Sequence, residues 1–324
     1  MAFASDTPMT TGFFSHPDCK RHDMGLSHPE SPARLQAIED QLISSRIVDF
    51  LEHREAPTAS VAMLSTVHTL DLISLIANHV PPESSGADHH YPLDGDTALN
   101  PYSLKAALRA AGAAVAATDA VMAGDLDNAF CSIRPPGHHA TPTTPMGFCL
   151  FNNVAIAARR ALDFHGLHRV AVVDFDVHHG NGTQDVFRDD PRVLMVSFYQ
   201  HPFYPFTAHT ESRPGLHNML NLPVPAYTTG ETVRHLVTEK WLPALHAHQP
   251  EMIFISAGFD AHREDDMGLM GLVEADYAWM TRQMMMIAHK YSHGRIVSCL
   301  EGGYNLSALG RSVVAHLKAL AEID

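Results

Sequence analysis

Short apolar runs recur along this chain, and longer amphipathic stretches separate them. Each short run lacks the strict alternation of apolar and polar residues that marks a half-exposed strand. The pattern is typical of strands buried on both faces, as in a parallel sheet covered by helices. We therefore predict buried strands over Ala129–Arg134, Val170–Asp174, Val193–Phe198, Met252–Ala257 and Arg295–Leu300.

The stretches between these runs carry apolar residues at helical spacing. After Pro32, for example, Leu35, Ile38, Leu42 and Ile47 recur at intervals close to one helical turn. Strands that alternate with helices predict βαβ crossovers and an α/β fold of three layers. Further helices are predicted over Ser103–Gly124, Asn152–Gly166, Glu231–His248, Glu274–Tyr291 and Ser307–Ala321.

Two segments fit neither pattern. Pro81–Gly95 and Tyr199–Tyr227 are expected to be irregular loops. Periodic segments resume on both sides of each loop, so neither is predicted to be an interdomain linker. We therefore predict one domain over residues 1–324.

Composition narrows the class of protein. Hydrophobic residues make up 45% of the 324 residues, which permits a sizeable core and excludes global disorder. The formal net charge of −14 disfavours binding to nucleic acid, and no apolar run approaches the length of a membrane span. The chain begins without a secretory signal pattern, and its four cysteines show no C-x-x-C spacing. We expect a reduced, cytoplasmic protein that binds neither nucleic acid nor membrane.

The 24 histidines outnumber the 22 lysines and arginines, which modestly favours metal or acid–base chemistry. The strand RVAVVD continues into Asp174, Asp176 and His178. The strand period of two would place these three side chains on one side, at the carboxyl end of a parallel strand. Two carboxylates and an imidazole in one place suit Zn²⁺ or another first-row divalent ion. The bland alternative is a polar strand end with solvated side chains.

Three other apolar strands end in reactive residue types. Asp260 follows MIFISAGF, His138 and His139 follow AFCSIRPPG, and Tyr304 follows IVSCLEGG. Each residue alone is as readily a turn residue, a surface histidine or a packed tyrosine. Adjacent histidines are expected to point apart and so to differ in role. Because parallel strands end at one edge of a sheet, we expect all four strand ends to form one site suited to metal-dependent hydrolysis.

These residues resemble the zinc-dependent histone deacetylase superfamily, in its class II or bacterial deacetylase-like branch. The resemblance implies the arginase–deacetylase fold, which has a central, mostly parallel sheet of about eight strands with helices on both faces. It implies a metal-dependent amidohydrolase that removes an acetyl group from an amine. The matching segments are HDMGLSHPESPARL at 22–35, LDGDTALNPYSLKAALRAAGA at 93–113, RPPGHHA at 134–140, GFCLFNN at 147–153, DFDVHHGNGTQ at 174–184, SAGFDAH at 256–262 and EGGYN at 301–305.

The resemblance also implies which residues bind metal. Asp176, His178 and Asp260 match the ligands of one catalytic Zn²⁺ that activates a water molecule. Family members also hold a monovalent cation, so we expect K⁺ near Asp174, Asp176, His178 and Ser197.

Five positions match the catalytic residues of the family. His139 matches the general base that later protonates the leaving amine, and His138 matches its partner histidine. Asp174 matches the carboxylate that holds His138, and Asn181 matches the residue behind His139, which is Asn in class II. Tyr304 matches the phenol that binds the oxyanion beside zinc.

The resemblance places the acyl-lysine tunnel between two aromatic residues. Phe148 and Tyr204 match its walls, and Gly147 contributes backbone to it. The family usually has a glycine-rich stretch after the second aromatic residue, but Phe206 and Ala208 stand at those positions here. The departure concerns the rim and the choice of substrate rather than the metal centre.

Two other functions stay open beside deacetylation. An arginase-like ureohydrolase would need further carboxylates for a second metal, and SAGFDAHRED offers only Asp260 in the expected register. A non-catalytic acyl-amine binding protein would be favoured if His139, Tyr304 or a metal ligand were missing, and none is missing.

The substrate is expected to be an acetylated protein lysine or a small acylamine such as an acetylpolyamine, and the oligomeric state is left open. Met267 matches the position that faces the tunnel mouth. A polyamine-selective relative has glutamate there, and an apolar Met267 favours acetyl-lysine-like substrates. The net charge and a set of acidic rim candidates favour polycations instead. These candidates are Asp94, Asp96, Asp265 and Asp266.

Overall fold

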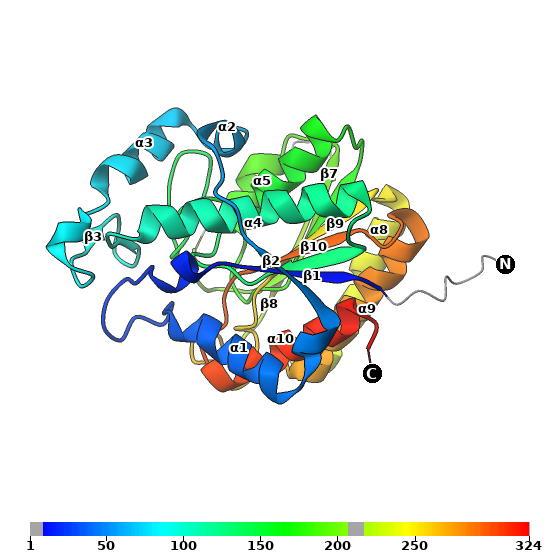
Figure 1. Cartoon of the computed structure of the whole chain (residues 1–324). Coiled ribbons are helices and arrows are strands. Elements are labelled where there is room, and N and C mark those ends of the chain that lie inside the picture. The colour runs from blue at the N-terminus through cyan, green and yellow to red at the C-terminus, as the bar shows by residue number, and fades with distance from the viewer. Residues whose placement is uncertain (1–8, 207–216, 324) are drawn as a thin grey trace.

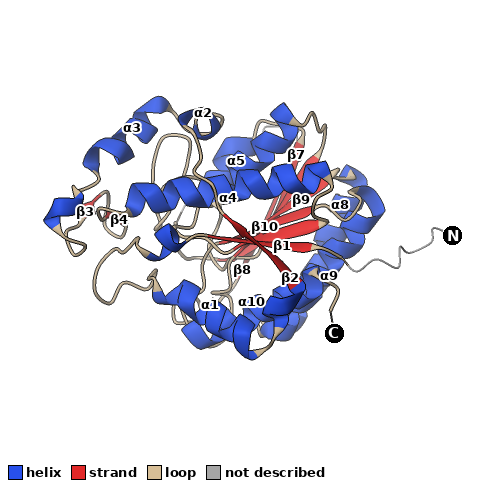
Figure 2. Ribbon diagram, viewed as in Figure 1, coloured by secondary structure: helices blue, strands red, loops and turns tan. Residues whose placement is uncertain are grey.

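An eight-stranded sheet forms the middle layer of the computed structural model, which describes residues 9–206 and 217–323 (Figure 1). The strand order is β2-β1-β5-β10-β9-β6-β7-β8, and each pairing within the sheet is parallel. A separate antiparallel ribbon contains β3 and β4 (Figure 2). The strands are β1 (Thr11–Ser15), β2 (Leu51–Glu55), β3 (Tyr91–Pro92), β4 (Ala98–Leu99), β5 (Asn128–Cys131), β6 (Val170–Asp174), β7 (Val193–Gln200), β8 (Met219–Val224), β9 (Met252–Ala257) and β10 (Ile296–Leu300).

Helices cover both faces of this sheet, as the arginase–deacetylase fold requires. Helices α4 and α5 lie over one face, and α1, α9 and α10 lie over the other (Figure 2). Each face has its own apolar cluster, so the core is double. The helices are α1 (Ala33–Ser44), α2 (Val61–Leu64), α3 (Leu70–His79), α4 (Ser103–Ala123), α5 (Asn153–Arg159), α6 (Asn181–Phe187), α7 (Gly230–Leu236), α8 (Leu242–His248), α9 (Glu274–Tyr291) and α10 (Leu306–Leu320).

All five predicted strands are present. Strands β6 and β9 match the prediction at both ends, and β5 ends earlier than predicted, at Cys131. The predicted helices are also present. Two of them contain a π-helical turn, at Arg160–Phe164 and at Val237–Trp241. The short buried apolar runs therefore predicted the centre of the sheet correctly.

The prediction of an irregular loop over Tyr199–Tyr227 is wrong at both ends. Strand β7 continues to Gln200, and β8 forms the edge of the sheet. The sequence MLNLPV contains a polar residue and a proline, so it lacks the continuous apolar run from which the central strands were predicted. Most of β8 is accordingly only partly buried. The opposite edge strand, β2, is LEHRE and was missed for the same reason. Pro81–Gly95 is mostly irregular, as predicted, but it contributes β3.

Helix α4 is a core helix of unusual composition. By length and hydropathy it could cross a membrane, but 67% of its most apolar window is buried inside the protein. Its small side chains permit close packing, because a Cβ atom on Gly112 would lie 2.0 Å from the carbonyl oxygen of Pro57. The helix ends at Gly124, whose φ of 79° is the left-handed conformation that favours glycine at this position.

The strand order brings together segments that are far apart in sequence. Strands β5, β10, β9 and β6 are consecutive neighbours in the middle of the sheet. Because all four are parallel, the segments that follow them leave the sheet at the same edge. These segments contain the residues singled out for chemistry.

Candidate metal centre and active site

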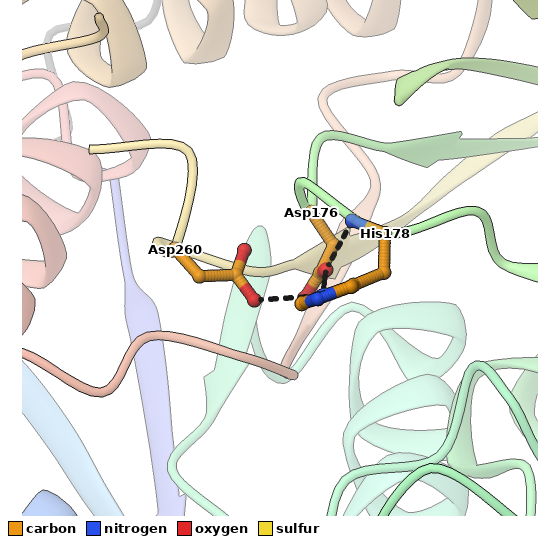
Figure 3. A group of neighbouring side chains, drawn as sticks. All are labelled: Asp176, His178 and Asp260. Carbon is orange, nitrogen blue, oxygen red and sulfur yellow. Dashed lines mark hydrogen bonds and ion pairs between the residues drawn. The ribbon is translucent and has the colours of Figure 1, made fainter. Parts of the chain in front are cut away.

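Asp176, His178 and Asp260 form a compact buried group (Figure 3). One nitrogen or oxygen atom from each residue lies within 4.8 Å of the other two. The Nδ1 atom of His178 lies 3.0 Å from Asp176 Oδ1 and 3.2 Å from Asp260 Oδ2. Among the described residues, this is the only group of such side chains that could hold a metal ion.

Asp174, Asp176 and His178 do not share one strand, contrary to the sequence prediction. Strand β6 ends at Asp174, and Asp176 and His178 lie in the turn after it. Asp176 accepts a hydrogen bond from the backbone N–H of His178 at 2.8 Å, which bends the chain. The turn, rather than the strand period, therefore places the two side chains together.

The electrostatics of this group favour a cation. Burial and the nearby Asp176 carboxylate raise the pKa of Asp260 to about 7. The Oδ2 atom of Asp260 is buried and forms no well-aligned hydrogen bond, although His178 Nδ1 lies 3.2 Å from it. A divalent ion would offset the cost of burying two carboxylates, and two oxygens with one nitrogen suit Zn²⁺.

Two glycines make room around the carboxylates. A Cβ atom on Gly258 would lie 2.0 Å from Asp176 Oδ2, and one on Gly302 would lie 2.1 Å from Asp260 Oδ2. The backbone N–H of Gly302 also donates to Asp176 Oδ2 at 2.9 Å. The carboxylates are therefore held by backbone that only glycine permits to approach so closely.

The tandem histidines lie beside this group, in the loop after β5. Adjacent side chains of an extended chain point apart, and the sequence analysis expected this of the two histidines. Their ring centroids are only 4.0 Å apart, so this expectation is wrong. The segment PPGHH turns instead of extending. Their hydrogen-bond partners nevertheless differ. His138 Nδ1 lies 3.0 Å from Asp174 Oδ2, and His139 Nδ1 lies 2.7 Å from Asn181 Oδ1.

These partners give the two histidines opposite acid–base behaviour. Burial alone would lower the pKa of His138, but the carboxylates of Asp176 and Asp174 outweigh it and hold the pKa well above its usual range. Burial and the neighbouring His138 and His178 hold the pKa of His139 well below its usual range. A charged histidine beside a neutral one is suited to one electrostatic role and one proton-transfer role.

Tyr304 is the fourth predicted component, and the loop after β10 carries it into the same cavity. Burial and the nearby Asp260 hold the pKa of its phenol well above the usual range, so the hydroxyl keeps its proton at neutral pH. Asp265 accepts hydrogen bonds from the backbone N–H groups of Tyr304 at 2.6 Å and of Asn305 at 2.8 Å. Asp265 is therefore buried in a structural role, and its prediction as a rim residue is wrong.

A cavity of about 200 Å³ reaches the metal group at His178. Phe148 and Tyr204 line it, as predicted from the resemblance, and Met267 lines it as well. Phe203 also lines the cavity and stacks on His178, with ring centroids 5.3 Å apart and an interplanar angle of 16°. Two exposed carboxylates, Asp96 and Asp266, complete the lining.

Gly147 and Phe148 form a tight backbone turn in the cavity wall. Both have positive φ values, 56° and 67°. A Cβ atom on Gly147 would lie 2.5 Å from His139 Cδ2 and 3.0 Å from Tyr204 Cε1. A side chain at this position would therefore displace both the histidine and the tunnel wall.

Comparison with known proteins decides the family. The histone deacetylase domain model matches residues 28–320. The chain belongs to the histone deacetylase family. It is 36% identical to the type-2 histone deacetylase 2 of Dictyostelium discoideum, over 95% of this chain and 20% of that protein. It is 34% identical to the human polyamine deacetylase HDAC10, over 99% of this chain and 47% of that protein.

This histone deacetylase family member thus spans about a fifth and about half of the length of those two relatives. Its fold superposes on the crystal structure of the HDA15 HD domain with a TM-score of 0.90. The two chains are 32% identical, and the match covers 97% of this chain and 89% of that one. These comparisons support a deacetylase of the hydrolytic kind and the arginase–deacetylase fold.

The structure describes the residues expected to bind K⁺ in this family member, but only part of its rim loop. Ser197 lies directly beside Asp174 in the β6–β7 register, and its hydroxyl donates to Asn221 at 2.8 Å. The monovalent cation stays a prediction. Phe206 is exposed next to Tyr204, whereas Ala208 lies outside the described residues.

Sequence reasoning missed Phe203 and Glu301. Phe203 directly precedes Tyr204, which the resemblance assigned to the tunnel wall. This adjacency was the signal that could have identified Phe203. Glu301 follows the apolar strand β10 and is fully buried, as a lone acidic residue after such a strand can be.

Among the acidic rim candidates, Asp94 accepts hydrogen bonds from the backbone of its own loop, at the N–H groups of Asp96 and Thr97.

Proposed function

We propose that this chain uses one Zn²⁺ to hydrolyse the acetamide of acetyl-lysine-like acylamines. The observation that carries the proposal is convergence in one cavity. His139, His178 and Tyr304 all line the 200 Å³ cavity, together with the aromatic residues Phe148 and Tyr204. Asp176 and Asp260 sit behind His178 in the only group of potential metal ligands among the described residues.

Zn²⁺ bound to Asp176, His178 and Asp260 would polarise the substrate carbonyl and increase the acidity of a water molecule. His139 then removes a proton from the attacking water at Nε2. Its Nδ1 faces the Asn181 carbonyl oxygen and therefore carries hydrogen, which leaves Nε2 as the basic atom.

Two further side chains act as the carbonyl becomes tetrahedral. The neutral Tyr304 hydroxyl donates to the oxygen on which negative charge develops. His138 stays protonated beside Asp174 and contributes positive charge near the same centre. His139 finally returns its proton to the leaving amine, so water and amide give acetate and a free amine.

A single catalytic ion distinguishes this proposal from an arginase-like ureohydrolase. Two-metal sites hold their ions close together and need additional bridging carboxylates. Within residues 9–206 and 217–323, the structure groups only two carboxylates with one imidazole.

We retain K⁺ near Asp174 and Ser197 as a structural ion of the proposed holoenzyme. The four buried free thiols support a reducing compartment such as the cytoplasm as the place of action.

Acetylpolyamine hydrolysis is the second candidate, and a specific observation favours it. Asp96 and Asp266 are both exposed and both line the cavity, where they would attract the distal ammonium of a polyamine. Met267 lies at the same mouth and offers no charge. Exposed carboxylates in water contribute little, whereas apolar walls fit the lysyl methylene chain. The balance therefore favours acetyl-lysine.

A panel of substrates tests this choice. Acetate release from an acetyl-lysine peptide is compared with release from acetylputrescine and N8-acetylspermidine, with the zinc-loaded protein in each case. The proposal predicts a higher kcat/KM for the peptide. A clear preference for polyamines that Asp266→Asn abolishes would favour the second candidate. Binding without acetate release from any substrate would identify a non-catalytic acyl-amine binding protein.

A further inference from the structure

Glu301 is a fully buried carboxylate beside the site that takes no part in the chemistry described above. Its Oε2 atom accepts hydrogen bonds from the backbone N–H groups of Gly137 at 2.6 Å and of His138 at 3.1 Å. Its Oε1 atom accepts from the hydroxyl of Ser256 at 3.1 Å. A buried carboxylate is costly unless such bonds satisfy it.

These bonds join three strand ends. Glu301 follows β10, Ser256 belongs to β9, and Gly137 and His138 lie in the loop after β5. The backbone N–H of Glu301 also donates to the carbonyl oxygen of Ala257 at 3.0 Å. This one side chain therefore links the loop of the tandem histidines directly to the strand that leads to Asp260.

The histidine loop is fixed from its other side by packing. A Cβ atom on Gly137 would lie 2.5 Å from the backbone nitrogen of Asn153 and 2.8 Å from the carbonyl oxygen of Phe151. The backbone N–H of Thr183 also donates to the carbonyl oxygen of His138 at 3.1 Å, and Glu301 bonds the loop at the two preceding N–H groups. A carboxyl group that bonds two consecutive N–H groups determines where the loop stops.

We infer that Glu301 is a positioning residue that sets the location of His138 and His139 relative to the metal ligands. The inference rests on the proposed function, because it concerns the same proton transfer. The reach of the side chain, and not its charge, is what the hydrogen bonds require. A misplacement of about 1 Å costs on the order of 10²-fold in rate.

Two variants separate reach from charge. Glu301→Gln keeps the length and offers an amide oxygen to both N–H groups, while its NH₂ group can donate to Ser256. Glu301→Asp keeps the charge but withdraws the acceptor by one methylene group. We expect Glu301→Gln to retain kcat within about threefold. We expect Glu301→Asp to lower kcat by about 10- to 100-fold with KM nearly unchanged.

Metal content and a control variant on the same strand complete the experiment. Ser298→Ala removes a buried hydrogen bond to His316. It should lower the melting temperature without changing kcat. Zinc content should be normal in all variants. A larger loss in Glu301→Gln than in Glu301→Asp would overturn the inference in favour of charge, and unchanged kcat in both would overturn it altogether. Absent acetate release by the wild-type protein would instead contradict the proposed function.

Discussion

The Nδ1 atom of His139 lies 2.7 Å from the side-chain oxygen of Asn181. The amide nitrogen of Asn181 lies 3.4 Å from the sulfur of Met146, which is consistent with the amide oxygen facing the histidine. An amide oxygen only accepts hydrogen bonds, so it fixes the tautomer of His139 without adding charge. Burial and the neighbouring His138 and His178 keep the pKa of His139 low, and the hydrogen bond to the uncharged Asn181 raises it too little to offset them.

Asn181→Asp should therefore shift the pH dependence of the reaction. A carboxylate at Nδ1 stabilises the imidazolium and raises the pKa of His139. A general base must be unprotonated to act, so the acid limb of kcat/KM should move to higher pH, by about one unit. The measurement is a pH–rate profile with an acetyl-lysine peptide. A variant whose acid limb stays in place would show that His139 is not the titrating base.

Gly147→Ala should inactivate the enzyme through crowding. The new methyl group would press on His139 and Tyr204, and the positive φ of the residue adds strain of about 1–2 kcal/mol. Gly166→Ala is the matched control, because Gly166 has a φ of 74° and no atom lies within 4 Å of its Cβ position. Both variants should lose stability, but only Gly147→Ala should lose kcat/KM. Equal activities would mean that the wall tolerates displacement.

Tyr304→Phe should reduce kcat by about 10²- to 10⁴-fold while zinc remains bound. The phenol supplies a hydrogen bond only where charge develops, and it is not part of the metal group. His139→Ala should also reduce kcat while zinc remains bound, because the variant lacks the general base. Acetate release and elemental analysis on one preparation measure both effects. Loss of zinc from both variants would mean that they are ligands.

Stability should fall at mildly acidic pH because His68 is buried in its neutral form. Its Nε2 accepts from the backbone N–H of Asn152 at 2.9 Å, and its Nδ1 lies 3.0 Å from the carbonyl oxygen of Thr141. Burial lowers the pKa of His68 to about 4. The unfolded chain, with the ordinary pKa of 6.5, binds a proton first. The contribution of His68 to the free energy of unfolding is thus fully present above pH 6.5 and decreases as the pH falls toward 4, by up to about 1.4 kcal/mol per unit.

Melting temperatures between pH 7 and pH 4 test this linkage. His68→Gln should be less stable at pH 7 and show a shallower decrease toward pH 4. His235→Gln changes an exposed histidine and should follow the wild-type curve. Glu30 contributes at lower pH, because its ion pairs with Arg134 and Arg34 overcome burial and lower its pKa to about 2. Identical slopes in the His68→Gln and wild-type proteins would contradict the assignment.

The sequence predicted the central strands and the residues after them because both depend on local patterns. Asp260 follows a continuous apolar run, and such a run predicts a buried strand whichever strands lie beside it. The edge strands, and the short buried strand β1 beside one of them, were not found in this way. LEHRE at β2 exposes charged residues, and MLNLPV at β8 is only partly buried.

Long-range contacts explain what the sequence did not predict at the site. Asp265 belongs to the polar run REDD at 263–266, which is typical of an exposed rim. Its side chain nevertheless turns inward and accepts a hydrogen bond from the backbone of Tyr304, 39 residues later. Glu301 bonds to His138 across 163 residues. Such partners depend on the strand order, which the periodicity of one chain does not specify.

Zinc titration of the metal-free protein tests the central claim most directly. Chelator-treated protein should regain acetate release in proportion to bound zinc, with saturation at one ion per chain. Asp260→Asn keeps the shape of a ligand but removes its charge, and it should neither retain zinc at equal concentration nor release acetate. Full acetate release by the metal-free protein, or normal zinc content in Asp260→Asn, would contradict a single catalytic ion held by Asp176, His178 and Asp260.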